Sequence, residues 1–251
     1  MSWASRRRIL ITALIAIVAI IAIAIPTYLS LSKAPTCMDG ELNGEESGVD
    51  CGGVCARVCL ADVRAPKTEF VRAIQTSSGR TDVIAYIDNP NGDSLGTLVP
   101  YELSVYDENN RELVSRKDTI TLLPGRTPLY VPNIFNSDER VARAFISFAP
   151  EQGTWTVYRK SRPNVVVEIV TLETPDTTPR LVVVLHNRTT NPLKDLLVVA
   201  THFDVNNNIV GASQTVVPLL SPDDSSTAYF TWNEPFMSPS VRQEIVPVFV
   251  P

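Results

Sequence analysis

The sequence lacks most of the groups that enzymes use for chemistry. Its 251 residues contain two histidines, His186 and His202. No Gly-x-Ser-x-Gly elbow, His-Glu-x-x-His pair, phosphate-binding loop or dinucleotide fingerprint occurs. We therefore expect a protein that is not an enzyme.

Basic surface and helical patterning are also scarce. Lysine and arginine total 22 against 27 acidic residues, and no basic patch favours a nucleic acid partner. After residue 31, no segment of helical length carries an apolar stripe with a period of 3.6 residues. These absences predict an all-β protein that does not bind nucleic acid.

Cysteine is absent outside one short segment that contains Cys37, Cys51, Cys55 and Cys59. The remaining chain must therefore be stabilised by burial of apolar side chains, at about 25 cal/mol per Å². Apolar residues make up 44% of the sequence, which is enough for real cores, and 251 residues allow one or two domains.

The first 31 residues form a separate segment. Arg6–Arg8 precede the 17-residue run Ile9–Ile25, in which only Thr12 is polar. Extended to Leu31, the run would form a helix of about 34 Å, against a hydrocarbon core of about 30 Å. The basic flank predicts a cytoplasmic N-terminus, with the bulk of the chain in the periplasm or at the cell surface. A cleaved signal peptide is the alternative, but the run is long and no clear small-x-small site follows it.

Residues 32–61 have the composition of a small module without a core. Five acidic residues, one arginine and five glycines lie between Cys37 and Cys59. In an oxidising compartment the four cysteines are expected to form two disulfides, and three pairings are open. A zinc site is the alternative, although the spacing lacks paired Cys-x2-Cys knuckles.

The same module offers a calcium hypothesis. Oxygen-bearing residues fall at the offsets of a twelve-residue calcium loop, and Gly44 stands at the sixth position, where the chain must turn sharply. The alternative is an acidic, solvated cluster of turns, because the twelfth residue is the short Asp and no helix flanks the loop. The candidate ligands are Asp39, Glu41, Asn43, Glu45 (through its carbonyl), Ser47 and Asp50.

From residue 62 onward, short runs rich in Val, Ile, Tyr, Phe and Thr alternate with turn residues, which predicts strands. Asp107–Arg111 and Asp204–Asn208 are predicted hairpin turns. The expected strands are Val83–Ile87, Tyr101–Tyr106, Thr119–Leu123, Arg143–Phe148, Val165–Thr171, Leu181–His186, Leu196–Phe203, Ala212–Val217, Thr227–Trp232 and Glu244–Val250.

These runs also contain an internal repeat. Tyr106-Asp107 aligns with Phe203-Asp204 at an offset of 97, and Asn89 aligns with Asn187 at 98. An offset of this length predicts duplicated domains over residues 62–160 and 163–251, divided at Arg159–Pro163. A single larger sandwich is the alternative.

The second copy resembles a known family. Val182-Val-Val-Leu-His-Asn, the following polar loop, His202-Phe-Asp204 and Pro222 are similar to the FxLYD family of bacterial immunoglobulin-like domains. The first copy matches more loosely through Val105-Tyr-Asp107. The resemblance implies two tandem immunoglobulin-like β-sandwiches outside the cytoplasm, and no catalytic residues.

The cysteine module carries a second resemblance, to a motif of secreted bacterial proteins. Its residues are Cys37, Asp39-Gly40, Asn43-Gly-Glu45, Gly48–Gly53, Cys55 and Cys59. This likeness supports extracytoplasmic placement and implies no activity.

Two remaining groups of residues have a functional and a structural interpretation. His186 and His202 could be neighbours across one sheet and serve a metal-dependent enzyme or sensor accessory, but ordinary strand positions are the simpler view. Trp155, Trp232 and Tyr229 could form a binding face, but strand aromatics more often belong to cores.

The sequence thus predicts a membrane-anchored, non-enzymatic protein without a cofactor. Its two β domains would act as spacers or as interaction modules for a protein partner at the cell envelope. A calcium-dependent adhesion or envelope-assembly component is the alternative.

Overall fold

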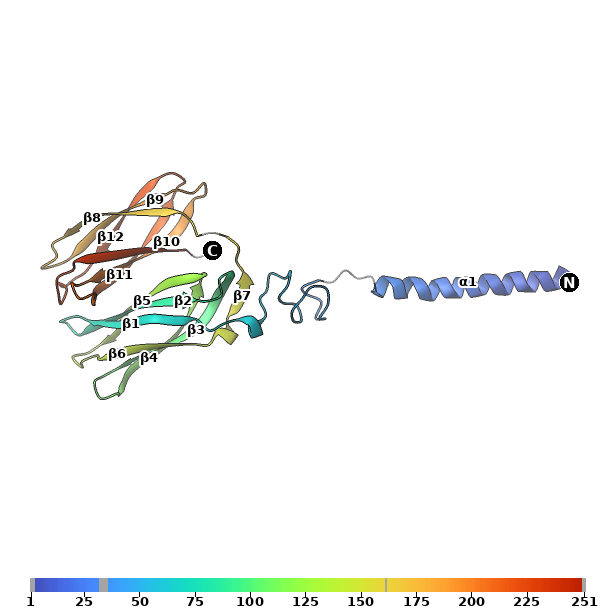
Figure 1. Cartoon of the computed structure of the whole chain (residues 1–251), viewed down its shortest axis with the longest axis horizontal. Coiled ribbons are helices and arrows are strands. Elements are labelled where there is room, and N and C mark those ends of the chain that lie inside the picture. Colours follow the sequence, from blue (N-terminus) through green and yellow to red (C-terminus); the bar gives the residue numbers. More distant parts are fainter. Residues whose placement is uncertain (1–2, 32–35, 161, 250–251) are drawn as a thin grey trace. The chain divides into compact units, whose positions relative to one another are not determined.

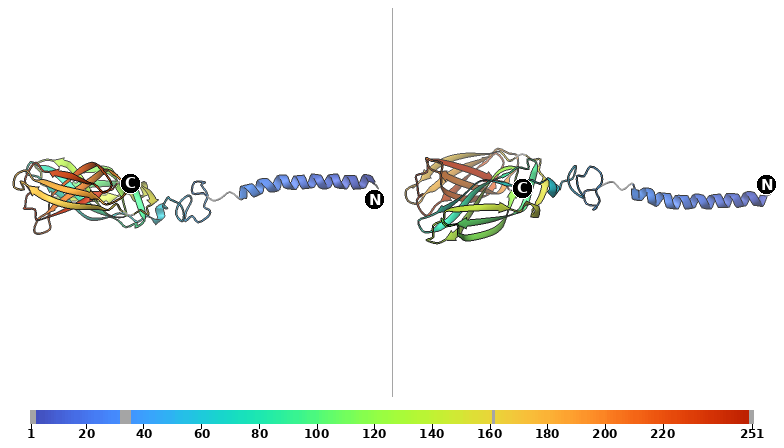
Figure 2. Two further views of the ribbon diagram at one scale, coloured as in Figure 1. Left: turned by 90° about the horizontal axis from the view of Figure 1, so that it is seen from above. Right: turned by 60° about the horizontal axis from the view of Figure 1, so that its bottom comes forward.

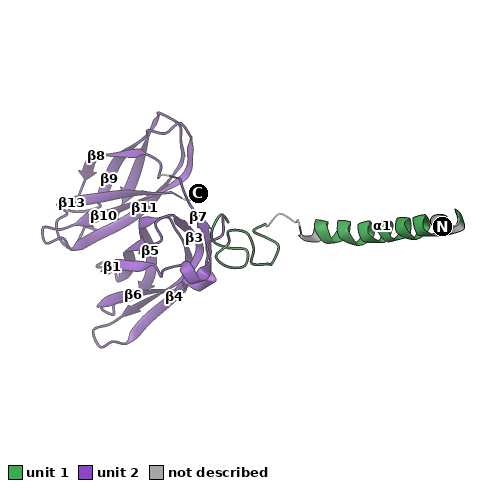
Figure 3. Cartoon of the chain, turned by 45° about the vertical axis from the view of Figure 1, so that its right-hand side comes forward, with its two compact units in different colours: residues 1–55 green, residues 56–251 purple. Residues whose placement is uncertain are grey.

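The computed structural model describes residues 3–31, 36–160 and 162–249, and the chain divides into two compact units, residues 1–55 and 56–251 (Figure 3). Strands make up 52% of the chain and helix 12%. The all-β expectation with an N-terminal helix and a disulfide-containing stretch is therefore confirmed.

The helix α1 covers Trp3–Leu31, and its segment Ile9–Tyr28 is long and apolar enough to cross a membrane. The 20 residues of that segment correspond to about 30 Å of helix. Two hydroxyls inside it donate to backbone carbonyls one turn back, Thr12 to Ile9 and Thr27 to Ile23. These bonds satisfy polar groups that would be costly in lipid.

Two sheets build the first half of the larger unit (Figure 1). One sheet has the order β1-β2-β5, and the other has the order β4-β3-β6, with β7 also paired to β3. Residues 56–58 hydrogen bond alongside β7, through Val58 N to Trp155 O and Val157 N to Ala56 O. The strands are β1 Lys67–Gln75, β2 Arg80–Asn89, β3 Ser94–Tyr106, β4 Glu112–Leu122, β5 Gly125–Asn136, β6 Arg143–Phe148 and β7 Thr154–Val157.

The second half has the same connectivity. Its sheets are β8-β9-β12 and β11-β10-β13, which correspond to β1-β2-β5 and β4-β3-β6. The strands are β8 Val165–Glu173, β9 Arg180–Asn187, β10 Leu193–Phe203, β11 Ile209–Leu220, β12 Ser225–Thr231 and β13 Arg242–Val248.

The core of the second half lies between these two sheets. Leu181, Val183 and Leu185 of β9 are fully buried in it, and Phe230 and Trp232 pack beside them. The three β9 residues face the same side because alternate residues of a strand point to the same face of a sheet. The pattern of alternation in the sequence therefore identifies the inward face of β9.

The two halves repeat the same hydrogen bonds at a buried asparagine. Asn89 Nδ2 donates to the carbonyls of Ser94 and Leu122, at 2.8 and 3.1 Å. Asn187 Nδ2 donates to the carbonyls of Asn191 and Leu220, at 2.9 and 3.1 Å. Each amide therefore ties the end of one strand to the segment that follows it and to the end of a strand in the opposite sheet.

The predicted turns Asp107–Arg111 and Asp204–Asn208 also match each other, and both predicted hairpins are present. Asp107 Oδ1 accepts from the backbone N–H groups of residues 109 and 111, and Asp204 Oδ1 accepts from those of residues 206 and 208. Asn110 and Asn207 have φ values of 65° and 60°, in the left-handed region that asparagine tolerates.

The two halves pack against each other through one sheet of each (Figures 1 and 2). Ile84 and Tyr86 of β2 form a buried cluster with Val199 of β10 and Ala212 of β11. The Tyr86 hydroxyl lies 3.3 Å from Thr201 Oγ1. Because β2 and β10 are covered on both faces, long stretches of both strands are buried.

Candidate functional site

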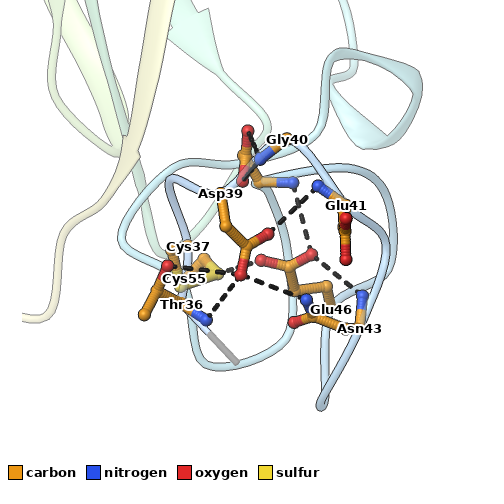
Figure 4. The surroundings of a disulfide bond; sticks show 9 residues. Thr36, Cys37, Asp39, Gly40, Glu41, Asn43, Glu46 and Cys55 are labelled. Atoms are coloured by element: carbon orange, nitrogen blue, oxygen red, sulfur yellow. Dashed lines mark hydrogen bonds between the residues drawn. A yellow bond between two sulfur atoms is a disulfide. The ribbon is translucent and has the colours of Figure 1, made fainter. Parts of the chain in front are cut away.

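The disulfide-closed module is the first candidate site (Figure 4). Cys37 and Cys55 are bonded to each other, with their Cα atoms 5.6 Å apart. Cys51 and Cys59 are also disulfide-bonded, so the described part of the chain has no free cysteine. The expected disulfides are confirmed, and sulfurs in this state offer no thiolate to zinc.

Asp39 organises the first turn of the module. Its carboxylate accepts hydrogen bonds from Asn43 Nδ2, at 3.1 Å, and from the backbone N–H groups of Thr36 and Glu41. The hydrogen bond from Asn43, followed by those from the two backbone groups, lowers the pKa of Asp39 to about 2. The carboxylate therefore stays ionised through the ordinary pH range.

Glu46 and Asp50 have a similar role in the next turns. Glu46 Oε2 accepts from the backbone N–H groups of Asn43 and Asp50, and Asp50 accepts from Gly40 N at 3.1 Å. Glu46 Oε1 lies 3.3 Å from Cys55 Sγ, but a disulfide sulfur has no proton to donate. Sequence reasoning missed Glu46, and its position three residues after Asn43 was the available signal.

The structure places the six predicted calcium ligands in different roles. Asp39, Asn43 and Asp50 hydrogen bond within the module, whereas the side chains of Glu41, Glu45 and Ser47 are exposed. Asn43 Oδ1 is buried without a hydrogen-bond partner. A bound cation would use that oxygen, and Asp39 would have to exchange some of its N–H donors for the ion.

Two glycines allow this compact path. Gly44 has a φ of 59°, which agrees with the sharp turn predicted at the sixth position of the loop. Gly53 has a φ of 57°, and a Cβ atom there would lie 1.6 Å from Glu45 O. The carbonyl proposed as a calcium ligand therefore packs closely against the backbone at Gly53.

The histidines do not form the pair that the sequence suggested. His186 belongs to β9 and His202 to β10, and these strands lie in different sheets because the loop between them crosses the sandwich. His186 lies between Ser225 Oγ, at 2.7 Å, and Glu168, at 3.4 Å. His202 is fully buried.

The surroundings of His202 are mostly aromatic. Its ring centroid lies 4.7 Å from those of both Trp232 and Phe236, and Nδ1 lies 2.8 Å from Ser240 Oγ. Nε2 has no hydrogen-bond partner. Burial lowers the pKa of His202 to about 4, so the ring is neutral near pH 7.

The proposed aromatic face is not formed as one surface. Trp155 and Trp232 are 1% and 9% exposed and belong to the cores of different halves. Tyr229 is exposed, and the Arg180 guanidinium lies 4.6 Å from its ring centroid. The structural interpretation therefore holds for both tryptophans.

A pocket of about 200 Å³ lies where the tips of the two halves meet. Its polar lining includes Arg80 and Asp82, joined by an ion pair of 2.6 Å, and Glu234. Asp82 also accepts from Tyr130 Oη at 2.7 Å, and Glu234 accepts from the hydroxyls of Ser77 and Ser78. These carboxylates hold strands and loops in place.

No protein-family model and no curated protein matches the chain. Among solved structures, a transglutaminase of red sea bream shares 14% identity at a TM-score of 0.23, covering 74% of this chain and 31% of that one. An exo-chitosanase of Amycolatopsis orientalis shares 12% identity at a TM-score of 0.18, covering 71% and 26%. A β-glucuronidase of glycoside hydrolase family 2 shares 10% identity at a TM-score of 0.21, covering 81% and 25%.

The chain spans between a quarter and a third of the length of these three structures. At such TM-scores the likenesses carry no argument about the activity of this chain.

Proposed function

We propose that the chain is a single-pass, membrane-anchored protein whose β-sandwiches serve as non-enzymatic spacer or interaction domains outside the cytoplasm. The observation that carries the proposal is an apolar helix of spanning length followed by a module closed by disulfides. Disulfides persist in oxidising compartments, and the basic flank Arg6–Arg8 favours a cytoplasmic N-terminus.

The recurring hydrogen bonds support the view that the two halves are tandem copies of one immunoglobulin-like domain. Asn89 and Asn187 have equivalent partners, as do Asp107 and Asp204. The resemblance to the FxLYD family belongs to this proposal. Each half has a core of its own, which supports the division into residues 62–160 and 163–251.

The non-enzymatic part of the proposal rests on how the polar groups are used. The neutral ring of His202 is enclosed by aromatic side chains, and Asp82 is held by Arg80 and Tyr130. Two serine hydroxyls do contact imidazole rings, Ser240 that of His202 and Ser225 that of His186. The proposal therefore rests on the complete burial of His202 and on the exposed positions of Ser225 and Glu168, where water is not excluded.

The test is a topology assay in the full chain. A reporter active only outside the cytoplasm, fused after Pro251, is expected to be active, and the four cysteines are expected to resist alkylation until reduced. As a control, Arg6–Arg8 are replaced by Glu, which should lower the reporter signal. If a second reporter, active only in the cytoplasm and fused at the same point, gives the signal instead, the topology is rejected. A mature chain without residues 1–31 would reject the anchor.

Calcium dependence is the second candidate function, favoured by the unpartnered oxygen of Asn43. Calcium would stiffen the module between the helix and the sandwiches. Adding calcium at about 1 mM, on the order of the affinity of extracellular sites, is expected to slow proteolysis within residues 36–55. An Asn43→Ala variant is expected to lose that protection, and equal cleavage with calcium and with chelator would reject this function.

A further inference from the structure

A groove of about 410 Å³ lies beside the edge strands β1 and β6 of the first half. Figures 1 and 3 both show β6 next to β1, and each of these strands ends its own sheet. Val71 and Ala73 of β1 and Ile146 of β6 line the groove and also pack on the core of this half. The groove therefore opens onto partly exposed core side chains at two strand edges.

The side of β6 that faces away from β3, which we call the β6 edge, offers backbone groups for pairing. Ala149 N donates to Pro100 O at 3.0 Å, one residue beyond the end of the β3–β6 ladder. Bonded and non-bonded residues alternate along an antiparallel pair, so Ala144, Ile146 and Phe148 direct their N–H and C=O groups away from β3. Among the described strands, β6 pairs with β3 alone, and these groups are available to a further strand.

The equivalent edge of the second half is blocked by a proline. Tyr101 pairs with Phe148, and Val198, its counterpart at the offset of 97, pairs with Pro247. Proline has no N–H to donate and is tolerated in an edge strand on the side away from its neighbour, which agrees with the direction assigned to Phe148. The first half therefore keeps a backbone donor that the second half lacks.

The same side of β3 already has an added segment farther along. β4 pairs with β3 from Gly96 to Tyr106, so β6 and β7 share the other side of β3. Residues 56–58 lie along β7, where Val58 N donates to Trp155 O at 3.0 Å. An extended piece of chain thus covers this side of the sheet at β7 and leaves it open at β6.

The lining of the groove sets the chemistry of its occupant. Arg72 and Arg143 are the charged residues of the lining, and both are exposed. Neither forms an ion pair with a carboxylate in the part of the chain that the structure describes. Phe145 of β6 also lines the groove, is 56% exposed and packs edge-on against Tyr106. The groove therefore combines positive charge with exposed apolar and aromatic surface.

We infer that the β6 edge binds an extended segment of a partner protein as an added strand, in which apolar residues alternate with acidic ones. In this mode of recognition, backbone hydrogen bonds give affinity and alternate side chains give specificity. The apolar residues of the segment cover Val71 and Ile146, and its acidic residues complement Arg72 and Arg143. The inference rests on the proposed role of the sandwiches as interaction domains and names the chemistry of their partner.

The experiment measures binding of two labelled peptides of about nine residues, within the usual length of a strand, to the full chain in detergent. Valine alternates with glutamate in one peptide and with lysine in the other. By fluorescence anisotropy, the Val-Glu peptide is expected to bind at least about tenfold more tightly than the Val-Lys peptide, because the charges of the lining are positive. Its binding is also expected to slow hydrogen exchange at the N–H groups of Ala144, Ile146 and Phe148 at least about tenfold.

Matched variants locate the contact. Ala144→Pro removes an N–H that points away from β3, as Pro247 does in the second half, and is expected to weaken binding at least about tenfold. Arg143→Glu is expected to weaken binding at least about fivefold by reversing a charge beside the added strand. Lys117→Glu, on β4 at the opposite edge of the same sheet, is the control and should leave binding unchanged.

The outcomes separate the alternatives. Equal affinity for the two peptides, or no binding of either up to about 1 mM, would overturn the inference. Binding of anionic lipid vesicles in place of the peptides, abolished by Arg143→Glu, would also overturn it and assign the groove to lipid. If Ala144→Pro fails to fold by circular dichroism, Arg143→Glu and the hydrogen exchange decide. A chain that binds no peptide but passes the topology assay would overturn this inference while leaving the membrane-anchored placement of the proposed function intact.

Discussion

The two halves of the β region share an internal framework but differ in their outward faces. Asn89 and Asn187 make equivalent hydrogen bonds, and the sheets have the same strand order. Yet Ile84 is fully buried between the halves, whereas its counterpart Val182 lies on a face without a covering sheet among the described strands. The comparison shows that equivalent strands give the two halves the same internal framework. The outward-facing residues of each sheet decide what that sheet contacts.

The largest expected difference comes from matched substitutions at this contact. Ile84→Ala is expected to lower the free energy of unfolding by about 2–5 kcal/mol, because it leaves a cavity between the halves. Val182→Ala should cost about 1 kcal/mol or less, since its side chain retains contact with water. Urea unfolding of the full chain in detergent, followed by tryptophan fluorescence, measures both. Equal losses would contradict the difference between the two faces.

The shared framework predicts equal effects at the asparagines. Asn89→Ala and Asn187→Ala each leave two carbonyls without their amide donor. Each substitution should cost about 2–4 kcal/mol of unfolding free energy, because unsatisfied buried polar groups are expensive. The same urea titration applies. A large loss in one variant with none in the other would show that the two positions are not equivalent.

His202 makes a contribution to the pH dependence of the second half that Val105, at the equivalent position of the first half, cannot make. The pKa of His202 is lowered to about 4, against about 6.5 in an unfolded chain. As pH falls from about 6.5 to about 4, the unfolded state binds a proton before the folded state does, and stability is lost. The slope attributable to His202 is at most about 1.4 kcal/mol per pH unit.

The measurement is stability against pH for the wild type and for His202→Gln, with His186→Gln as the control. His202→Gln is expected to flatten the curve between about pH 6.5 and about pH 4. If both variants keep the wild-type slope, the loss of stability comes from other groups.

The smallest expected effect concerns the tips of the halves, where Glu234 accepts from Ser77 and Ser78. Glu234→Gln keeps the size of the side chain but removes its charge. Because the side chain lies at the surface and is only partly buried, the loss should be about 1 kcal/mol or less. Thermal unfolding with and without salt at about 1 M measures it, and a loss comparable with that of Ile84→Ala would mean that the tips hold the halves together.

Most strands could be predicted from the sequence, but three could not. β5 contains Pro128 and Pro132, which argue against a strand in a sequence, yet β5 is an edge strand and needs fewer N–H donors. β1 mixes charged and apolar residues, and β7 has four residues, too few for a clear pattern. The strand propensity of the residues predicts poorly where an edge position or a short length decides whether a strand forms.

The candidate site was less predictable than the fold. The spacing of acidic residues indicated a cation, but the same carboxylates can bind backbone N–H groups, as those of Asp39 and Asp50 do. The alternative of a histidine pair is not realised, and the preferred view of two separate strand positions holds, because β9 and β10 belong to different sheets. The contact between the halves had one usable signal, the near-continuous apolar run from Val83 to Ile87.

The central claim is that the chain contains two sandwiches, each with a core of its own, joined by one buried contact. Expression of residues 163–251 alone tests it most directly. The account predicts a β-type circular dichroism spectrum and a cooperative unfolding transition, at a lower midpoint than in the full chain because Val199 and Ala212 lose their cover. A fragment that stays unfolded until residues 62–160 are added would contradict the division into two domains.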